Sequence, residues 1–220
     1  MNSRRIRNRP SCTGSQAGAR SHVSPRESSC CRVPPCPRSV LGGPRRAGVV
    51  EFAVLTGHLS PRSRSAAVAR TLLDELRRSG AAATEVAVGE LPHSALMARN
   101  HRHRAVHASL RVVAEADAVA VVTPRYEPHG SVPLRSWLAM SPSEALVGKP
   151  VLPVGLGTVR SHSVGLGGGL GTARALPATF LYDHWFTETG GWSPDPRADD
   201  LLRRAARTLR ASAIGEIVAA

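Results

Sequence analysis

The uninterrupted apolar run at residues 117–123, Asp-Ala-Val-Ala-Val-Val-Thr, constrains the fold most. A strand that is apolar on both faces must be buried on both sides, which is typical of the centre of a parallel sheet covered by helices. Strand and helix patterns alternate around this run. Strands are expected at 49–56, 84–88, 150–155 and 178–184, and helices at 65–79, around 106–113, at 133–140 and at 198–219. Such regular alternation predicts an open, doubly wound α/β sheet.

The first 47 residues have a different composition from the rest and form a separate predicted segment. Residues 1–46 hold ten arginines and one acid, which leaves 19 basic and 15 acidic residues for the remainder of the chain. The segment is rich in Arg, Ser and Pro and has almost no aliphatic periodicity, so we expect it to be disordered. The predicted globular domain therefore spans residues 48–220. Its charge balance gives little support for nucleic-acid binding.

The Arg-rich segment admits two interpretations. It resembles a transit peptide or a nucleic-acid-binding tail, which would make it functional. The chain, however, contains 28 arginines and one lysine, a bias typical of GC-rich coding sequence. We favour an over-extended translation start over a working tail.

All four cysteines lie in this segment, so the predicted domain contains no thiol. A zinc site formed by Cys30, Cys31 and Cys36 with Cys12 or His22 lacks paired CxxC spacing and is the weaker alternative. No secretory signal and no apolar run long enough to cross a membrane is evident. We expect a cytoplasmic protein without a membrane partner.

In doubly wound sheets, ligands bind beyond the carboxyl ends of the strands, at the point where the strand order reverses. The loop at 57–65 joins a strand to a helix and carries serines and arginines, which suit a phosphate monoester at a helix N-terminus. The alternative is that Ser63 or Ser65 is an ordinary N-cap. The loop has neither the GxGxxG nor the GK[ST] pattern, so it indicates neither Rossmann-type NAD binding nor a P-loop.

Two further loops follow the next predicted strands. At 123–131, prolines restrict the backbone and Tyr126 offers an aromatic face, which suits a planar heterocycle. A rigid surface loop with a packing tyrosine explains the same residues. The loop at 155–162 is small and contains Gly157, which lets backbone approach a ligand closely.

Together these residues resemble the flavodoxin-like, NAD(P)H-dependent FMN reductases, notably the type that supplies alkanesulfonate monooxygenases. The resemblance covers about residues 52–176. It rests on Gly57 with Ser63-Arg64-Ser65, Ala116-Asp117, Thr123-Pro124-x-Tyr126, Leu134, Pro142, Ala145-Leu146, Gly148-Lys149, Val151-Leu152-Pro153, Gly157 and His162.

The resemblance implies a flavodoxin-like, five-stranded parallel sheet in a three-layer α/β/α arrangement. It also implies FMN and NAD(P)H as cofactors, a flavin-dependent monooxygenase as partner, and a homo-oligomer. The residues implied to bind the cofactor are Ser63, Arg64 and Ser65 for the phosphate, Pro124, Arg125, Tyr126, Glu127 and Ser131 along the isoalloxazine, and Gly157, Thr158 and His162 at its far edge. No catalytic side chain is expected, because hydride transfer between nicotinamide and flavin needs no protein nucleophile.

Several residues depart from the family pattern. Val132 replaces a usual glycine, Gly130 replaces a bulkier residue, and Arg125 and Glu127 change the charge of the loop. A non-catalytic or degenerate flavin-binding module is therefore the alternative to a reductase, and nucleic-acid binding through the Arg-rich tail is a third. The glycine-rich stretch at 164–176 keeps helical spacing of its apolar residues, so it is predicted to be a weak helix.

Overall fold

A parallel β-sheet forms the centre of the computed structural model, which describes residues 49–124, 131–141, 145–159, 161, 170, 171 and 173–219. The strands of this sheet are β1 (Glu51–Thr56), β2 (Ala82–Ala87), β3 (Ala118–Pro124), β4 (Pro150–Gly157), β5 (Arg174–Ala175) and β6 (Thr179–Tyr182). Their order is β2-β1-β3-β4, with β5 and β6 pairing with successive parts of β4. Since β5 and β6 share one edge position, the sheet has five positions in the flavodoxin-like order.

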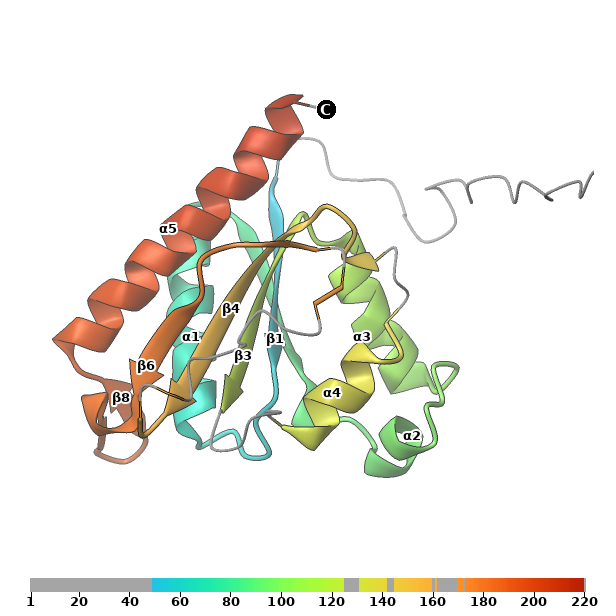
Figure 1. The fold of residues 1–220 in the computed structure, drawn as a ribbon, viewed down its shortest axis with the longest axis horizontal. Coiled ribbons are helices and arrows are strands. Elements are labelled where there is room, and N and C mark those ends of the chain that lie inside the picture. Colours follow the sequence, from blue (N-terminus) through green and yellow to red (C-terminus); the bar gives the residue numbers. More distant parts are fainter. Residues whose placement is uncertain are drawn as a thin grey trace, which may run out of the picture. The chain divides into compact units, whose positions relative to one another are not determined.

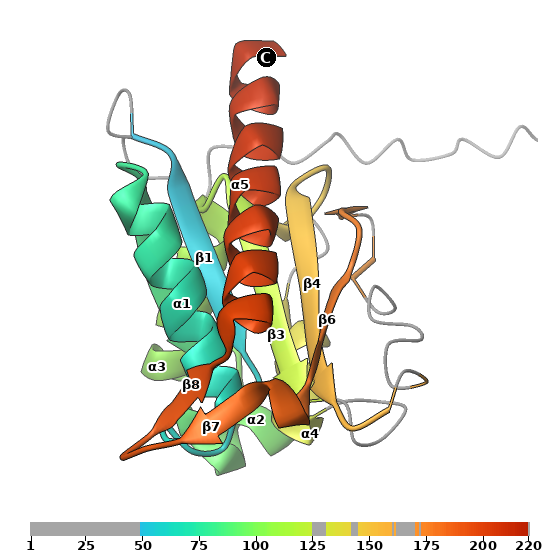
Figure 2. The same cartoon turned by 90° about the vertical axis from the view of Figure 1, so that its left-hand side faces the viewer.

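Helices cover both faces of the sheet. They are α1 (Arg64–Arg78), α2 (His93–Met97), α3 (Arg104–Glu115), α4 (Val132–Leu138) and α5 (Pro196–Ala219), with short 3₁₀ segments η1 (Val88–Glu90) and η4 (Asp183–Trp185). Helices α1 and α5 lie on one face, and α3 and α4 on the other (Figures 1 and 2). A small antiparallel hairpin of β7 (Phe186–Glu188) and β8 (Trp192–Pro194) precedes α5. The predicted doubly wound, three-layer α/β/α fold is confirmed.

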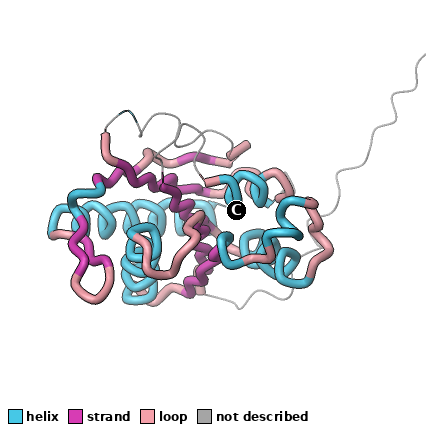
Figure 3. The backbone as a smooth tube through the Cα atoms, turned by 90° about the horizontal axis from the view of Figure 1, so that it is seen from below, coloured by secondary structure: helices cyan, strands magenta, loops and turns pink. Residues whose placement is uncertain are grey.

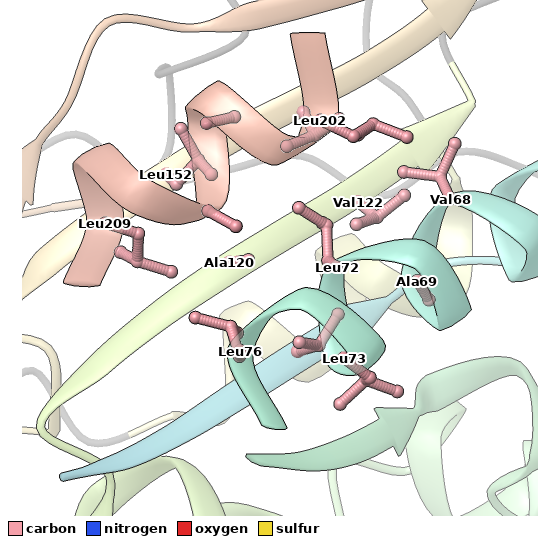
Figure 4. Close-up of a cluster of buried hydrophobic side chains, with 14 of the residues drawn as sticks. Val68, Ala69, Leu72, Leu73, Leu76, Ala120, Val122, Leu152, Leu202 and Leu209 are labelled. Carbon is pink, nitrogen blue, oxygen red and sulfur yellow. The ribbon is translucent and has the colours of Figure 1, made fainter. Parts of the chain in front are cut away.

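Side-chain alternation along the strands creates two hydrophobic cores. In β1, Phe52 and Val54 belong to the core beneath α1 and α5, whereas Ala53 and Leu55 belong to the core beneath α3 and α4. Figure 4 shows the first core, in which leucines of α1 and α5 pack over β3 and β4. The run at 117–123 forms β3, whose residues 118–123 are all buried, as its continuous apolar pattern predicts.

Most predicted elements are present with shifted ends. The second strand begins earlier than predicted, at Ala82, and Val88 belongs to η1 instead of the strand. The last predicted strand, 178–184, is shorter, because the chain turns into η4 at Asp183. The short helix α2 and the β7–β8 hairpin were not predicted, since neither has the length or periodicity that marks an element in sequence.

The prediction of a weak helix at 164–176 is wrong for the part that the structure describes. Gly171 has a positive φ of 61° in a turn, and Arg174 and Ala175 form β5. Residues 164–169 and 172, like the predicted N-terminal segment 1–47 and its cysteines, lie outside the described residues. Pairing of the Arg174–Ala175 backbone with Pro150 and Val151 takes the place of helical hydrogen bonds. In the described part of this stretch, helical spacing of the apolar residues therefore does not produce a helix.

None of the described helices is long and apolar enough to cross a membrane.

Candidate functional site

The carboxyl ends of β1, β3 and β4 lie at one edge of the sheet, where the predicted binding loops begin. In Figure 1 the arrowheads of β3 and β4 point to this edge, at the bottom of the view, and Figure 3 views the molecule from below. Strand β1 lies between β2 and β3, and the connection from β1 to β2 runs in the opposite direction across the sheet from that between β3 and β4. The edge beyond β1 and β3 is therefore the switch point at which such sheets bind ligands.

Helix α1 begins at this edge with a capped N-terminus. Ser63 is its N-cap, and its Oγ accepts a hydrogen bond from the backbone N–H of Ala66 at 3.2 Å. The N–H groups of Arg64 and Ser65, in the first turn, have no acceptor within the helix and carry the positive end of its dipole. Ser65 is only 4% exposed. The interpretation of Ser63 as an N-cap is confirmed, and the first turn of α1 has the unpaired backbone donors that an anion would need.

Arg64 supplies a full positive charge at this terminus. Its Cζ atom lies 3.7 Å from the ring centroid of Trp192 in strand β8, which is cation–π geometry. Its Nε is buried and donates no hydrogen bond to any residue in the described ranges. The side chain therefore holds a charge and a free donor next to the first turn of α1.

The loop from β1 to α1 is held in place from the side of β2. His58 is 4% exposed, and its Nε2 lies 3.3 Å from Oε1 of Glu85. The hydroxyl of Thr56 donates to the same carboxylate oxygen at 3.3 Å. The hydrogen bond from His58, its positive charge when protonated, and the hydrogen bond from Thr56 outweigh burial, so the pKa of Glu85 lies below its usual range.

Gly89 allows the η1 segment to approach this loop closely. A Cβ atom at position 89 would lie 1.8 Å from the backbone oxygen of His58. No side chain fits in that space, so glycine is required for η1 to pack against the backbone of the loop. The β1–α1 loop is thereby clamped between its own strand, Glu85 and η1.

Helix α4 begins beside the same loop. Ser131 is its N-cap, and the Oγ accepts from the N–H of Leu134 at 3.4 Å. A Cβ atom on Gly57 would lie 2.5 Å from that Oγ, so the β1–α1 loop and the start of α4 are in close contact. The N–H of Gly57 donates to the carbonyl of Val122 in β3 at 3.0 Å. Gly57 therefore joins the ends of β1 and β3 and the N-terminus of α4.

The body of α4 is fixed by a buried polar contact. Trp137 is fully buried, and its Nε1 donates to Oγ of Ser109 in α3 at 2.8 Å. The serine in turn donates to the carbonyl of Val106 at 2.7 Å. Because every polar atom in this chain of contacts is satisfied, α4 is held firmly on α3.

The other predicted site residues lie along the same edge or outside the described residues. Pro124 ends β3, where it pairs with Leu156 of β4, and Gly157 ends β4 beside Tyr182 of β6. Thr158 follows and is exposed. The structure thus brings Ser63, Arg64, Ser65, Pro124, Ser131, Gly157 and Thr158 to one edge of the sheet. Arg125, Tyr126, Glu127 and His162 lie outside the described residues.

Three contributors to this site were missed in the sequence. Trp192 is 128 residues from Arg64 in the chain, and no pattern in its surroundings indicates that its ring covers an arginine. Glu85 and Gly89 belong to the segment after helix α1 and support the loop from outside. The one signal available was the residue type, since a charged residue inside a strand and a glycine two residues after its end are unusual.

The donors at this edge fit the phosphate of FMN. The N-terminus of α1, the hydroxyls of Ser63 and Ser65 and the guanidinium of Arg64 present hydrogen-bond donors and positive charge, with no carboxylate among these residues. A phosphate monoester needs this combination. The close approach at Gly57 and the buried free Nε of Arg64 are the structural observations on which the fit rests.

Comparison with solved structures places the fold among flavoproteins. A NADH:FMN oxidoreductase, EMOB in its apo form, is 22% identical with a TM-score of 0.65, over 74% of this chain and 90% of that one. The flavoenzyme NAD(P)H:(acceptor) oxidoreductase FerB from Paracoccus denitrificans is 17% identical with a TM-score of 0.57, over 76% and 98%. A flavodoxin from the domain Archaea is 10% identical with a TM-score of 0.51, over 74% and 99%.

No curated protein sequence matches the chain. The family model described as NADPH-dependent FMN reductase matches residues 50–171, which is more than half of the 220 residues. This range contains the sheet edge, both capped helix N-termini and the clamped loop. The resemblance inferred from the sequence is therefore confirmed at the level of the family, and the chain belongs to the NADPH-dependent FMN reductases.

Proposed function

We propose that this enzyme holds the FMN phosphate at the N-terminus of α1 and passes reduced FMN to a flavin-dependent monooxygenase. Its general activity follows from the family: it is an NAD(P)H-dependent FMN reductase with FMN and NAD(P)H as cofactors. The observation that carries the proposed site is the placement of Arg64, stacked on Trp192 with a buried free Nε, at a capped helix terminus.

The proposed division of the site follows the sheet edge. Ser63, Arg64 and Ser65 bind the phosphate through a hydroxyl, a guanidinium and backbone N–H groups. The segment from Pro124 to Ser131, including Arg125, Tyr126 and Glu127, lies along the isoalloxazine ring, and Gly157, Thr158 and His162 lie at its far edge. This assignment rests on the family resemblance and on the positions of the described members at the switch point.

When bound, FMN supplies the redox chemistry, as the acceptor of a hydride from NAD(P)H. The chain contributes binding and orientation. The clamp formed by Thr56, His58, Glu85 and Gly89 fixes the β1–α1 loop, so little ordering of that loop is left to occur on binding. The Gly57 contact sets the distance between the two helix N-termini. No step in this scheme requires a nucleophilic or acid–base side chain.

Turnover by the full-length protein tests the enzyme assignment. Oxidation of NADH and NADPH is followed by absorbance with no flavin, with riboflavin and with FMN. We expect oxidation that depends on added flavin and is faster with FMN. If folded protein binds flavin without oxidising NADH or NADPH, the alternative of a non-catalytic flavin-binding module is favoured. The replacement of a usual glycine by Val132 is the sequence feature that suggests this alternative.

Coupling to a monooxygenase tests the proposed partner. Free reduced flavin is consumed by oxygen in solution, so a reductase that makes it is useful to an enzyme that uses it directly. A purified alkanesulfonate monooxygenase is given an alkanesulfonate and oxygen, with this protein as the sole source of reduced FMN and with catalase present. It is expected to release sulfite from the alkanesulfonate. Absence of sulfite while NAD(P)H is consumed would argue against this partner and leave the reductase assignment intact.

We also propose a homo-oligomer and a separate N-terminal segment before residue 48. The oligomer is supported by the family resemblance, and exposed apolar side chains such as Leu59 and Val147, exposed by 75% and 50%, are accessible to a second copy. Light scattering coupled to size-exclusion chromatography gives the mass in solution. A monomeric mass with and without FMN would contradict the proposal.

A further inference from the structure

We propose that Trp192 is a positioning residue for the FMN phosphate, acting through Arg64. This inference rests on the proposed function, because it assumes that Arg64 binds the phosphate. It adds the β7–β8 hairpin to the site as the element that orients the guanidinium of Arg64.

The contact itself joins two segments that are far apart in the sequence. Arg64 is the first residue of α1, and Trp192 begins strand β8. The guanidinium carbon lies 3.7 Å from the ring centroid, well within the range of a cation–π contact. Both side chains are partly buried. Water therefore screens the interaction less than it would screen an exposed pair.

The hairpin that carries Trp192 is anchored at its base. Its strands pair from Phe186 with Pro194 to Glu188 with Trp192, and Phe186 is buried in the core beneath α1 and α5. The backbone N–H of Asp195 donates to the carbonyl of Trp185 at 2.7 Å. The carboxylate of Asp195 accepts from the N–H of Ala198 at 2.8 Å in the first turn of α5. Trp192 thus projects from a fixed support.

Stacking of this kind leaves the guanidinium able to bind an anion. The ring covers a face of the planar group, whereas the N–H donors lie in its plane. The buried Nε remains without a partner in the described part of the chain, and a buried donor left unpaired is costly until an acceptor reaches it. An arginine that is already fixed also loses less side-chain entropy when the phosphate binds. Trp192 should therefore favour FMN over flavins that lack the phosphate.

Comparison of FMN with riboflavin tests the inference, because riboflavin has the same ring system without the phosphate. The dissociation constants of both flavins are measured by flavin fluorescence for the full-length wild type and for Trp192→Leu. We expect Trp192→Leu to weaken FMN binding by about tenfold, a typical loss for a partly desolvated cation–π contact, and to leave riboflavin binding unchanged. Trp192→Phe keeps a flat aromatic face and is expected to restore most of the preference for FMN.

Trp185→Leu is the matched control. Trp185 is a partly buried tryptophan that also packs against the core beneath α1 and α5, and it makes no cation–π contact with Arg64. Its replacement should cost similar packing and leave the ratio of the two dissociation constants at the wild-type value. Thermal melting of each variant shows whether it is folded. In Arg64→Met, adding Trp192→Leu should produce no further change in the ratio.

The outcomes separate this inference from the proposed function. If the wild type prefers FMN, Arg64→Met removes that preference and folded Trp192→Leu keeps it, the inference is overturned and the phosphate site stands. Equal weakening of FMN and riboflavin by Trp192→Leu also overturns it, since the role would be merely structural. If the wild type binds FMN no better than riboflavin, or Arg64→Met leaves the preference intact, the proposed phosphate site itself fails.

Discussion

The N-termini of α1 and α4 meet at the same edge of the sheet, and both are capped by a serine. Ser63 caps α1 and Ser131 caps α4. Helix α1 adds a charged side chain in its first turn, Arg64, whereas the first residues of α4 are Val132 and Pro133. Proline has no backbone N–H, which removes one donor from that terminus. Two termini with the same cap thus differ in their capacity for an anion.

The two termini are also supported differently. The loop before α1 is held by polar contacts to Glu85, by the close packing of Gly89 and by the hairpin carrying Trp192. Helix α4 is held by its body, through Trp137 and Ser109. The support of α1 therefore lies at the turn where we propose that the phosphate binds. This difference indicates that a serine cap marks a helix terminus, and that the surrounding elements decide how firmly that terminus is held.

The largest expected effect is that of Gly89→Ala, which disturbs the support of α1 and leaves the support of α4 intact. The added Cβ would lie 1.8 Å from the backbone oxygen of His58, so the loop must move. We expect a loss of about 3 kcal/mol in the free energy of unfolding, at the upper end for overpacking. The melting temperature should fall by about 10 °C. FMN affinity should fall by about tenfold or more, because the displaced loop carries Ser63 and Arg64.

Gly215→Ala is the control for this variant. A Cβ at Gly215, in helix α5, meets no atom within 4 Å, and alanine favours the helix. Its stability is expected to equal or exceed that of the wild type, with unchanged flavin affinity. Wild-type stability in Gly89→Ala would show that the β1–α1 loop is not clamped as described.

The next largest effect is expected from a comparison of two arginines, Arg64 at the start of α1 and Arg135 within α4. Arg64→Met keeps an unbranched apolar side-chain stem and removes the charge, and it is expected to raise the dissociation constant of FMN by about 10- to 100-fold, as for loss of a charge-assisted hydrogen bond. Arg135→Met, at an exposed residue in the last turn of α4, is expected to change it by less than about twofold. Isothermal titration calorimetry with FMN gives both values. A larger effect at Arg135 would place the phosphate at α4.

The smallest expected effect concerns Glu85, which supports only the α1 side. Its pKa is lowered in the folded protein, chiefly by the hydrogen bond from His58. The carboxylate therefore stabilises the fold at pH above the usual Glu value, and this contribution is lost as the pH falls through the lowered pKa. The wild type should melt about 2 °C above Glu85→Gln at pH 7, and the difference should shrink below about pH 4.5.

Melting curves of both proteins between pH 7 and pH 3.5 provide the measurement. Glu115→Gln serves as the control, because Glu115 pairs with Arg111 on the exposed surface of α3 and such pairs contribute little. A difference between wild type and Glu85→Gln that stays constant over this range would contradict a role for the ionised carboxylate.

The sequence predicted the fold well where burial imposed a continuous pattern. The run at 117–123 was placed in a central strand because a strand buried on both faces has no room for polar residues, and β3 is that strand. The amphipathic pattern around Val106, Leu110 and Val113 predicted α3, in which all three side chains are buried. The helix predicted at 164–176 is wrong over its described part, because spacing alone does not reveal that Arg174 and Ala175 pair with β4.

The candidate site was only partly accessible from the sequence. The loop with Ser63, Arg64 and Ser65 was identified because hydroxyls and arginines at the start of a helix have a clear local chemistry. The contacts of Trp192 and Glu85 are not local. They arise because the hairpin before α5 and the strand after α1 both pack against the β1–α1 loop and the start of α1. Packing between such distant segments cannot be inferred from a local sequence pattern.

By itself the sequence therefore determined the doubly wound α/β fold, the sheet edge at which a ligand is expected and the family. Each depends on periodicity or on short motifs, which involve only residues close together in the sequence. Only the tertiary structure decided which side chains support that edge: a tryptophan 128 positions beyond Arg64, a glycine with no space for a Cβ, and a glutamate beneath a buried histidine. The physical reason is that these contacts depend on distances between elements, which are fixed only when the sheet and its helices have packed.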